Sequence, residues 1–262
     1  MSHDASLNPD LTRGPDGGWL EGPGPTLHSL SYAELARYDV GRPRAGSPSA
    51  AAFPHQVPSD GARIPRLADL FALAERAGNR EVRFNLEIKT SPLRPEETAS
   101  PDAIADAVVR VVREAGLQAR STIQSFDWRV VLRVQKTASD IRTACLTSQQ
   151  PDDDTVDAER PGPKPWLAGL DPGAVGGSVA SLVRSTGSRV WSPDYRDLTA
   201  PRLREAHALG LLVVVWTVDE PEDMARLSDL GVDGIITDYP DRLRALMIAR
   251  GMPVPTPTPV VP

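Results

Sequence analysis

Cysteine is almost absent from this chain, since Cys145 is the only one among 262 residues. A single cysteine excludes an intrachain disulfide and gives no information on the redox compartment. Apolar runs long enough to span a membrane, about 18 residues, are missing as well. The opening residues, MSHDASLNPDLTR, have neither the basic region nor the apolar core of a signal peptide. The sequence therefore predicts no transmembrane segment and assigns no compartment.

Positive charge is in the minority. The chain has 29 Lys and Arg residues against 35 Asp and Glu residues, which gives a net charge of −6. This balance argues against a nucleic-acid partner, because nucleic-acid binding needs a basic surface. It also gives no long-range steering of an anionic substrate. Any phosphate site must therefore be built from local groups.

Proline, by contrast, is abundant. The 26 prolines are about twice the usual share of ~5%, and they gather in loops and in the segment 251–262. We expect that segment to be a disordered tail. With 40% hydrophobic residues, residues 1–250 suffice for one large domain with a full core. Within it, residues 1–64 are expected to be a loop-rich segment with one short helix over 31–38.

From residue 65 onward, helix and strand patterns alternate. Helices are expected over residues 65–77, 101–115, 127–138, 179–186, 201–209, 221–230 and 241–250. Strands are expected over residues 82–89, 121–125, 141–146, 189–192, 212–218 and 234–237. Such alternation predicts an α/β fold with a parallel sheet. Six strands are two fewer than a (β/α)8 TIM-type barrel needs, unless two more strands lie in the irregular N-terminal part.

Residues 212–240 show this alternation most clearly. Leu212–Val215 is a continuous apolar run, as expected for a strand buried on both faces. Pro221 suits the first turn of the following helix, and Gly231 suits its end. Trp216 falls where the strand passes into its loop. In α/β barrels, these C-terminal strand ends carry the chemistry.

The segment RFNLEIK, residues 83–89, alternates polar and apolar side chains. Asn85, Glu87 and Lys89 share one face of the expected strand, because strand side chains repeat every two residues. An exposed antiparallel strand would simply direct this face to solvent. In a parallel sheet covered by helices, the charges would instead point into the barrel, where uncompensated charge is costly. We therefore interpret Glu87 as a ligand for a hard cation and Lys89 as a partner of phosphate oxygens.

The segment STIQSFDWR, residues 121–129, contains the end of another expected strand. Asp127 is predicted to be the N-cap of the following helix rather than a catalytic group, because Asp strongly favours that position. Phe126 fits either a pocket wall or the core. Trp216, at the end of its Val-rich strand, leaves the same two alternatives open.

Five motifs occur in order along the chain: SHD, NLEIK, QSFDWR, VWTV and DGIITDYPD. Together they resemble the glycerophosphodiester phosphodiesterase family from residue 2 to about residue 246. The resemblance implies a (β/α)8 barrel that hydrolyses glycerophosphodiesters to an alcohol and glycerol 3-phosphate with a divalent cation, Mg²⁺ or Ca²⁺. It also implies roles for five residues: His3 as general acid or base, Glu87 as metal ligand, and Lys89, Phe126 and Trp216 as substrate-binding residues.

His3 gains its role from this resemblance, because a lone histidine near a terminus carries little information. Imidazole titrates near neutrality, which suits proton transfer to or from the oxygens of a phosphodiester. His3 would protonate the leaving alkoxide or activate the nucleophile. That nucleophile would be water, or a hydroxyl of the glycerol that first gives a cyclic phosphate.

The chain departs from the family pattern at its start. Family members carry two earlier strands, which end in His-Arg-Gly and Glu-x-Asp, and nothing before His3 matches them. The resemblance therefore implies a TIM-type barrel that lacks its first two strands, and with them one histidine, one arginine and two metal ligands. We expect a misassigned start or a fragment. The alternative to an enzyme is a catalytically inactive remnant, or an interaction module, of the same fold. A lipid-acting barrel and a sugar-phosphate barrel agree less well with the loop sequences.

Overall fold

The computed structural model describes residues 1–260 and divides into two compact units. The first, here called the N-terminal unit, comprises Met1–Arg76 and Lys89–Ser100. The second, the sheet unit, comprises Ala77–Ile88 and the chain from Pro101 onward. The predicted tail, 251–262, ends in residues 261–262, which lie outside the described part of the chain.

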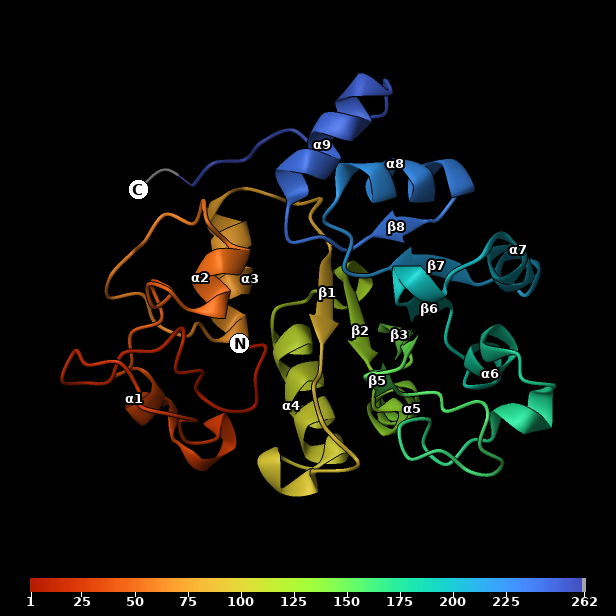
Figure 1. The fold of residues 1–262 in the computed structure, drawn as a ribbon, viewed down its shortest axis with the longest axis horizontal. Helices are drawn as coiled ribbons and strands as arrows, with labels where there is room; N and C mark the ends of the chain where they lie inside the picture. Colours follow the sequence, from red (N-terminus) through yellow and green to blue (C-terminus); the bar gives the residue numbers. More distant parts are fainter. Residues whose placement is uncertain (261–262) are drawn as a thin grey trace. The chain divides into compact units, whose positions relative to one another are not determined.

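The sheet unit is built around a parallel sheet (Figure 1). Its strands are β1 (Phe84–Glu87), β2 (Ser121–Ser125), β3 (Arg142–Thr147), β6 (Val190–Pro193), β7 (Leu212–Val215) and β8 (Gly234–Ile235). They lie in the order β1-β2-β3-β6-β7-β8, and each neighbouring pair is parallel. These are the six strands predicted from the sequence. In the described part of the chain β1 and β8 do not pair with each other, so the prediction of an incomplete barrel is confirmed.

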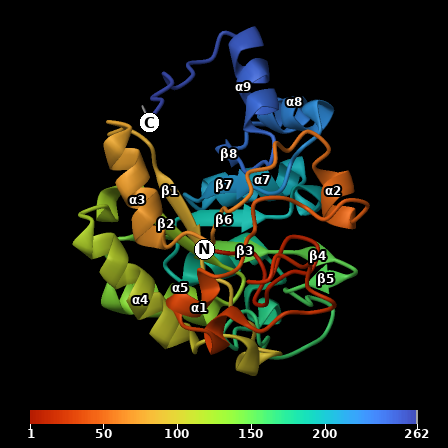
Figure 2. The same cartoon turned by 90° about the vertical axis from the view of Figure 1, so that its left-hand side faces the viewer.

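Helices connect the strands and cover the sheet. They are α4 (Pro101–Glu114), α5 (Trp128–Thr137), α6 (Val179–Ser185), α7 (Ala200–Ala208), α8 (Pro221–Leu230) and α9 (Pro240–Ala249). Helix α5 packs on β2 and β3, α7 packs on β7, and α8 packs on α9. A short antiparallel hairpin, β4 (Gln149–Gln150) and β5 (Asp153–Asp154), follows β3 and was not predicted from the sequence (Figure 2).

Helix α8 shows how the sequence sets these boundaries. Pro221 occupies the first turn, where its missing N–H removes no helical bond. Gly231 ends the helix at φ 94°, a left-handed conformation that costs glycine little. Between these ends, Met224 and Leu227 are fully buried in the main core cluster. Pro221 and Gly231 therefore determine where the helix begins and ends, and its apolar side chains determine which face packs on the core.

Cys145, in β3, lies in the core between the sheet and its helices. Its Sγ is 3.5 Å from Ser188 Oγ and 3.7 Å from Thr186 Oγ1. Burial raises the pKa of the Cys145 thiol to about 11. The reactive thiolate is therefore scarce at neutral pH and shielded from reagents.

We expect Cys145 in the native protein to react with a thiol reagent at pH 8 at least about a hundredfold more slowly than an exposed cysteine. The measurement is the rate of release of a chromogenic thiol, without and with urea. Ser29→Cys supplies an exposed reference, because Ser29 is open to solvent. Equal rates for the two cysteines in native protein would contradict the burial of Cys145.

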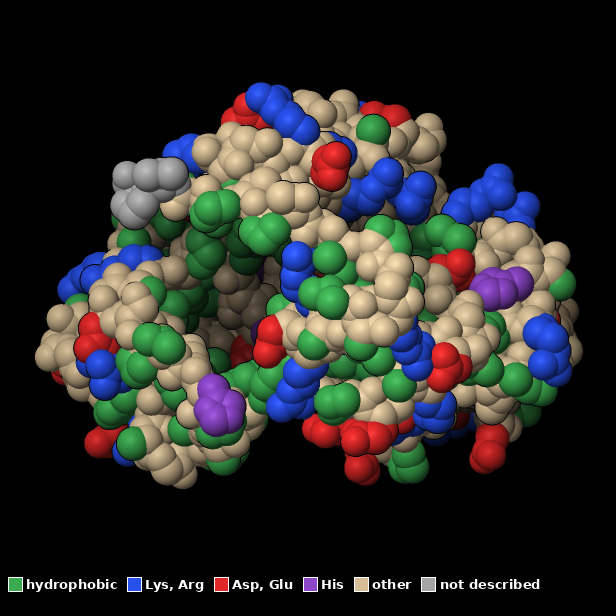
Figure 3. Space-filling model, turned by 90° about the horizontal axis from the view of Figure 1, so that it is seen from above, with side chains coloured by type: hydrophobic (Ala, Val, Ile, Leu, Met, Phe, Trp, Pro, Cys, Tyr) green, Lys and Arg blue, Asp and Glu red, His purple; other side chains and the backbone are tan. Residues whose placement is uncertain are grey.

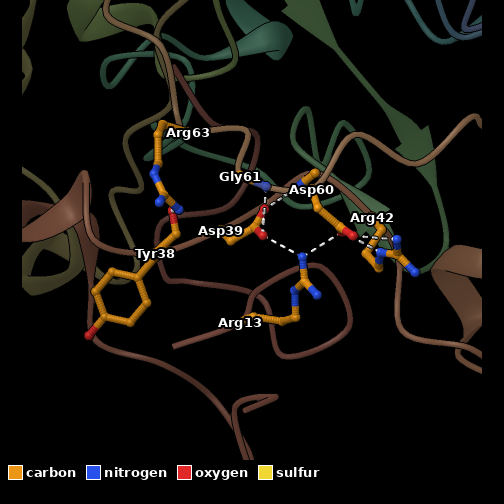
Figure 4. A network of polar contacts seen from close by, with 8 residues as sticks. Arg13, Tyr38, Asp39, Arg42, Asp60, Gly61 and Arg63 are labelled. Carbon is orange, nitrogen blue, oxygen red and sulfur yellow. Dashed lines mark hydrogen bonds and ion pairs between the residues drawn. The ribbon is translucent and has the colours of Figure 1, made fainter. Parts of the chain in front are cut away.

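The N-terminal unit has few regular elements: α1 (Tyr32–Leu35), α2 (Pro48–Ala52) and α3 (Leu67–Arg76). Its loops are joined by charge pairs (Figure 4). Arg13 pairs with Asp39 and with Asp60 (2.6 Å), and Arg42 contacts both oxygens of Asp60 at 2.5 and 2.6 Å. Asp39 also accepts 2.9 Å hydrogen bonds from two glycine amides. Such side-chain ion pairs and hydrogen bonds stabilise a segment that has little regular secondary structure.

The surface carries charges of both signs. On the face drawn in Figure 3, basic and acidic side chains are interspersed with hydrophobic ones. Within residues 1–260, no helix combines the length and apolar character needed to cross a membrane.

Candidate functional site

The first group of predicted site residues lies at the carboxyl end of the sheet. Glu87 closes β1 and is in register with Gln124 of β2. Asn85, two residues before Glu87 on the same face, donates a 2.8 Å hydrogen bond to Gln124 Oε1. Gln124 is 5% exposed, whereas Asn85 and Glu87 are open to solvent. One face of β1 and β2 therefore presents a polar row, while Phe84, Leu86 and Ile88 turn the other way into the core.

Phe126 and Trp216 form the second group. Phe126 follows β2 and Trp216 follows β7, so β3 and β6 separate them in the sheet. On a flat sheet, three strand spacings would place them about 14 Å apart. Their ring centroids are in fact 5.2 Å apart, edge to face. The sheet must therefore be strongly curled, and both half-buried rings lean over its concave side.

Trp216 is also fixed by its indole N–H, which donates a 2.8 Å hydrogen bond to the carbonyl oxygen of Ser192. Ser192, in the neighbouring β6, donates from its hydroxyl to the carbonyl of Val214 at 2.6 Å. These contacts hold the Trp216 side of the aromatic pair in place. An apolar wall with an oriented polar edge suits recognition of a small alcohol.

Asp127 has the structural role predicted for it. It is the N-cap of α5, and its buried carboxylate accepts a 3.2 Å hydrogen bond from the amide of Arg129. The same carboxylate pairs with the Arg129 guanidinium at 2.6 Å. The lone pairs of Asp127 are therefore directed at its own helix.

The β4–β5 hairpin is attached to this end of the sheet by Asp197. The carboxylate of Asp197 accepts hydrogen bonds from the Gln149 amide at 2.7 Å and from Gln150 Nε2 at 2.5 Å. Burial raises the pKa of the Asp197 carboxyl above its usual range. These two hydrogen bonds attach the hairpin after β3 to the segment that follows β6.

The remaining predicted residues, His3 and Lys89, belong to the N-terminal unit. His3 Nδ1 lies 2.8 Å from Asp4 Oδ1, and Asn8 donates to the other oxygen of Asp4 at 2.9 Å. The hydrogen bond with His3 holds the pKa of Asp4 below its ordinary value, and the charge of Lys89 acts in the same direction. His3 itself is 82% exposed. An imidazole oriented by a carboxylate, with its second nitrogen open, is the arrangement that general acid–base catalysis uses.

The structure thus groups the predicted residues in two sets, one in each unit. His3 and Lys89 both act on Asp4, while Phe126 and Trp216 touch each other in the sheet unit. Two residues beside them, Asp4 and Gln124, were not predicted from the sequence. Asp4 is adjacent to His3, and carboxylate–histidine neighbours are a known signal of oriented imidazole. Gln124 had no local signal, because its relation to Glu87 is created by strand pairing.

A divalent cation needs a richer set of ligands than these residues supply. Mg²⁺ and Ca²⁺ take about six or more oxygen ligands, several of them carboxylates. Among the described residues no group of three His, Cys, Asp or Glu side chains is arranged to hold a metal ion. Glu87 alone does not fit the cation that the resemblance implies, so no step of a reaction is assigned to a metal here.

Comparison with known proteins identifies the family of this chain. A family model described as the glycerophosphoryl diester phosphodiesterase family matches residues 1–242. A crystal structure from Silicibacter pomeroyi DSS-3, assigned as a glycerophosphoryl diester phosphodiesterase, is similar at 31% identity with a TM-score of 0.83. The alignment covers 96% of this chain and 79% of that chain.

Two further relatives extend the comparison. A phosphodiesterase from Oleispira antarctica, solved in complex with the product sn-glycerol-3-phosphate, is 18% identical with a TM-score of 0.63, over 94% of this chain and 78% of that chain. At that identity the likeness concerns the fold alone. The glycerophosphodiester phosphodiesterase of Caldanaerobacter subterraneus subsp. tengcongensis is 28% identical over 184 residues, 70% of this chain and 61% of that protein. The matched segments span between 17% and 68% of the lengths of the curated relatives.

Proposed function

Because the chain belongs to the glycerophosphoryl diester phosphodiesterase family, we propose that it acts on glycerophosphodiesters and hydrolyses them to an alcohol and glycerol 3-phosphate. The observation that carries the proposal is the family match over residues 1–242, in which the motifs around His3, Glu87, Phe126 and Trp216 all fall. The Oleispira antarctica structure, which holds sn-glycerol-3-phosphate, supports the choice of product.

The residues of this chain have separate tasks in the proposed reaction. His3, oriented by Asp4, transfers a proton to or from a phosphodiester oxygen. Lys89 neutralises a non-bridging phosphate oxygen as a point charge. Phe126 and Trp216 line the pocket for the glycerol or alcohol portion. Glu87 and Gln124 present polar groups to the substrate hydroxyls from the neighbouring strands β1 and β2.

A second candidate function is binding without turnover, as an interaction module of the same fold. It is favoured by one observation: the described residues contain no cluster of three possible metal ligands. If the family reaction needs a divalent cation, a chain with Glu87 as its one carboxylate at β1 would bind the diester and release it unchanged.

The deciding experiment measures binding and turnover on the same protein. Glycerophosphocholine is supplied with Mg²⁺, with Ca²⁺ or with EDTA, and release of glycerol 3-phosphate is followed with a coupled dehydrogenase assay. Calorimetry with glycerol 3-phosphate measures binding independently. Release above the protein-free rate supports hydrolysis, and its loss in EDTA supports a bound cation. Binding without release supports the interaction module, and neither binding nor release overturns both.

A further inference from the structure

One more side chain of the N-terminal unit, that of Asn8, contacts the carboxylate that orients His3. Asn8 Nδ2 donates a 2.9 Å hydrogen bond to Asp4 Oδ2, while His3 Nδ1 lies 2.8 Å from the other oxygen, Asp4 Oδ1. A carboxylate held at one oxygen alone turns easily, because the torsion of its terminal bond is broad. Since Asp4 is held at both oxygens, it presents Oδ1 to His3 in one direction.

The side-chain amide of Asn8 is itself held in one orientation. Its Oδ1 accepts a 2.9 Å hydrogen bond from the backbone amide of Asp10. The atom that faces this N–H must be the oxygen, so the atom that faces Asp4 must be the NH₂ nitrogen. The backbone forms a turn at the same place, because the amide of Leu11 donates to the carbonyl of Asn8 at 3.1 Å. Pro9 restricts the backbone of Asn8 to the extended region, which suits the entry to this turn.

The backbone on either side of Asn8 is anchored as well. Leu7 is 2% exposed, and its backbone makes two hydrogen bonds of 3.0 and 3.1 Å with residues 24–25. On the other side, the carbonyl of Asp10 accepts a 2.6 Å hydrogen bond from the amide of Arg44. Asn8 therefore stands on a part of the chain that is fixed by contacts remote in sequence.

The two residues that Asn8 supports are more open to solvent. The side chain of Asp4 is 42% exposed and that of His3 is 82% exposed. A hydrogen bond between two exposed side chains holds its geometry weakly, because water competes for both groups. The hydrogen bond with His3 is the main cause that lowers the pKa of Asp4, and the one from Asn8 acts in the same direction. Both donors thus favour the ionised carboxylate that accepts them.

We propose that Asn8 is a positioning residue, which acts through Asp4 to keep the proton of the neutral His3 ring on Nδ1. An ionised carboxylate only accepts hydrogen bonds, so Nδ1 must be the donor to Asp4. The lone pair then lies on Nε2, the nitrogen left for proton transfer. The catalytic part of this inference rests on the proposed function, whereas the position of the ring proton is measurable without turnover.

Two variants of the full chain separate the donor of Asn8 from its turn. Asn8→Asp keeps an oxygen for the amide of Asp10, but replaces the NH₂ donor with a second carboxylate beside Asp4. Asn8→Ala removes both contacts. Asn79→Ala is the matched control, because Asn79 makes the same kind of turn in the sheet unit, where its Oδ1 accepts from the amide of Glu81 at 3.0 Å.

The first measurement is the nitrogen NMR chemical shifts of the histidine rings, at a pH where free imidazole is neutral. We expect the Nδ1–H form at His3, and a mixture of both tautomers at the exposed His28. In both Asn8 variants the shifts of His3 should move toward those of His28, and in Asn79→Ala they should not move. Loss of the His3 signals in His3→Ala assigns them.

The second measurement is turnover of glycerophosphocholine. Both Asn8 variants should lower kcat about tenfold and leave KM within about twofold, because Asn8 acts through Asp4 and not on the substrate. If the unchanged chain releases no glycerol 3-phosphate, the proposed function fails, and the tautomer of His3 still decides on Asn8. If Asn8→Ala does not fold, Asn8→Asp, which keeps the turn, gives both readings.

Three results overturn the role of Asn8. The first is a mixture of tautomers at His3 in the unchanged chain. The second is a His3 ring that keeps its Nδ1–H form in the Asn8 variants, even if they unfold at a lower temperature. The third is an active chain whose kcat is the same in Asn8→Asp as in Asn79→Ala.

Discussion

Replacing His3 with alanine is expected to lower glycerol 3-phosphate release by about 10²- to 10⁴-fold, the range associated with a lost general acid or base. The imidazole is oriented through Nδ1 by Asp4, so its second nitrogen is the group offered for proton transfer. Because the side chain is 82% exposed, folding should not depend on it. The measurement is kcat/KM for glycerophosphocholine, together with the thermal unfolding midpoint.

Two control variants make this prediction specific. His28 is an exposed histidine of the same unit, in the turn Leu27–Ser29, and His28→Ala should leave kcat/KM unchanged. Asp4→Asn keeps the hydrogen-bonding shape but removes the charge that orients His3, and should lower kcat/KM less than His3→Ala does. Since the hydrogen bond with His3 holds the pKa of Asp4 below its ordinary value, the Asp4 carboxylate is ionised at and above that ordinary value. If His3→Ala retains more than half of the activity, His3 is not the acid or base.

The largest expected effect on folding is that of Trp128→Ala, which should lower the free energy of unfolding by about 3–5 kcal/mol. Trp128 is fully buried at the start of α5, and its indole N–H donates a 3.1 Å hydrogen bond to the carbonyl of Leu146 in β3. The substitution leaves a large cavity in the core cluster and an unsatisfied buried carbonyl. Urea unfolding followed by far-ultraviolet circular dichroism measures the change.

Leu132 offers a comparison on the same helix. Its side chain is 36% exposed, so Leu132→Ala should lower the free energy of unfolding by about 1 kcal/mol or less. Trp128→Phe retains most of the volume but loses the N–H donor, and an intermediate loss of about 1–3 kcal/mol is expected. Similar losses for Trp128→Ala and Leu132→Ala would show that α5 does not form part of the core described here.

Much of the sheet could be predicted from sequence because its signals are local. Buried strands appear as apolar runs, and residues such as Pro221 and Gly231 mark the two ends of a helix. The β4–β5 hairpin was missed because Gln149–Gln150 and Asp153–Asp154 have no β-propensity. They are held by their pairing and by Asp197, a residue 48 positions away from Gln149. No local pattern contains a contact at that separation.

The candidate site divides in the same way. His3, Glu87 and Lys89 were predicted as site residues from motifs, because their residue types are typical of proton transfer, cation binding and phosphate binding. Gln124 was not identified, since its place beside Glu87 comes from the register of β1 and β2. The contact between Phe126 and Trp216 depends on the curl of the sheet, which spacing along the chain does not encode. Residue types therefore predict the chemistry, whereas strand pairing and the curl of the sheet determine which side chains lie close together.

The path of the chain between the two units has a consequence for synthesis on the ribosome. The N-terminal unit receives residues Lys89–Ser100 only after β1 has been made, although β1 belongs to the sheet unit. The N-terminal unit therefore cannot be complete when only its segment Met1–Arg76 has left the ribosome. Its second segment, Lys89–Ser100, is made only after β1 of the sheet unit. Neither unit is thus one continuous stretch, and no single cut in the gene would yield either of them whole.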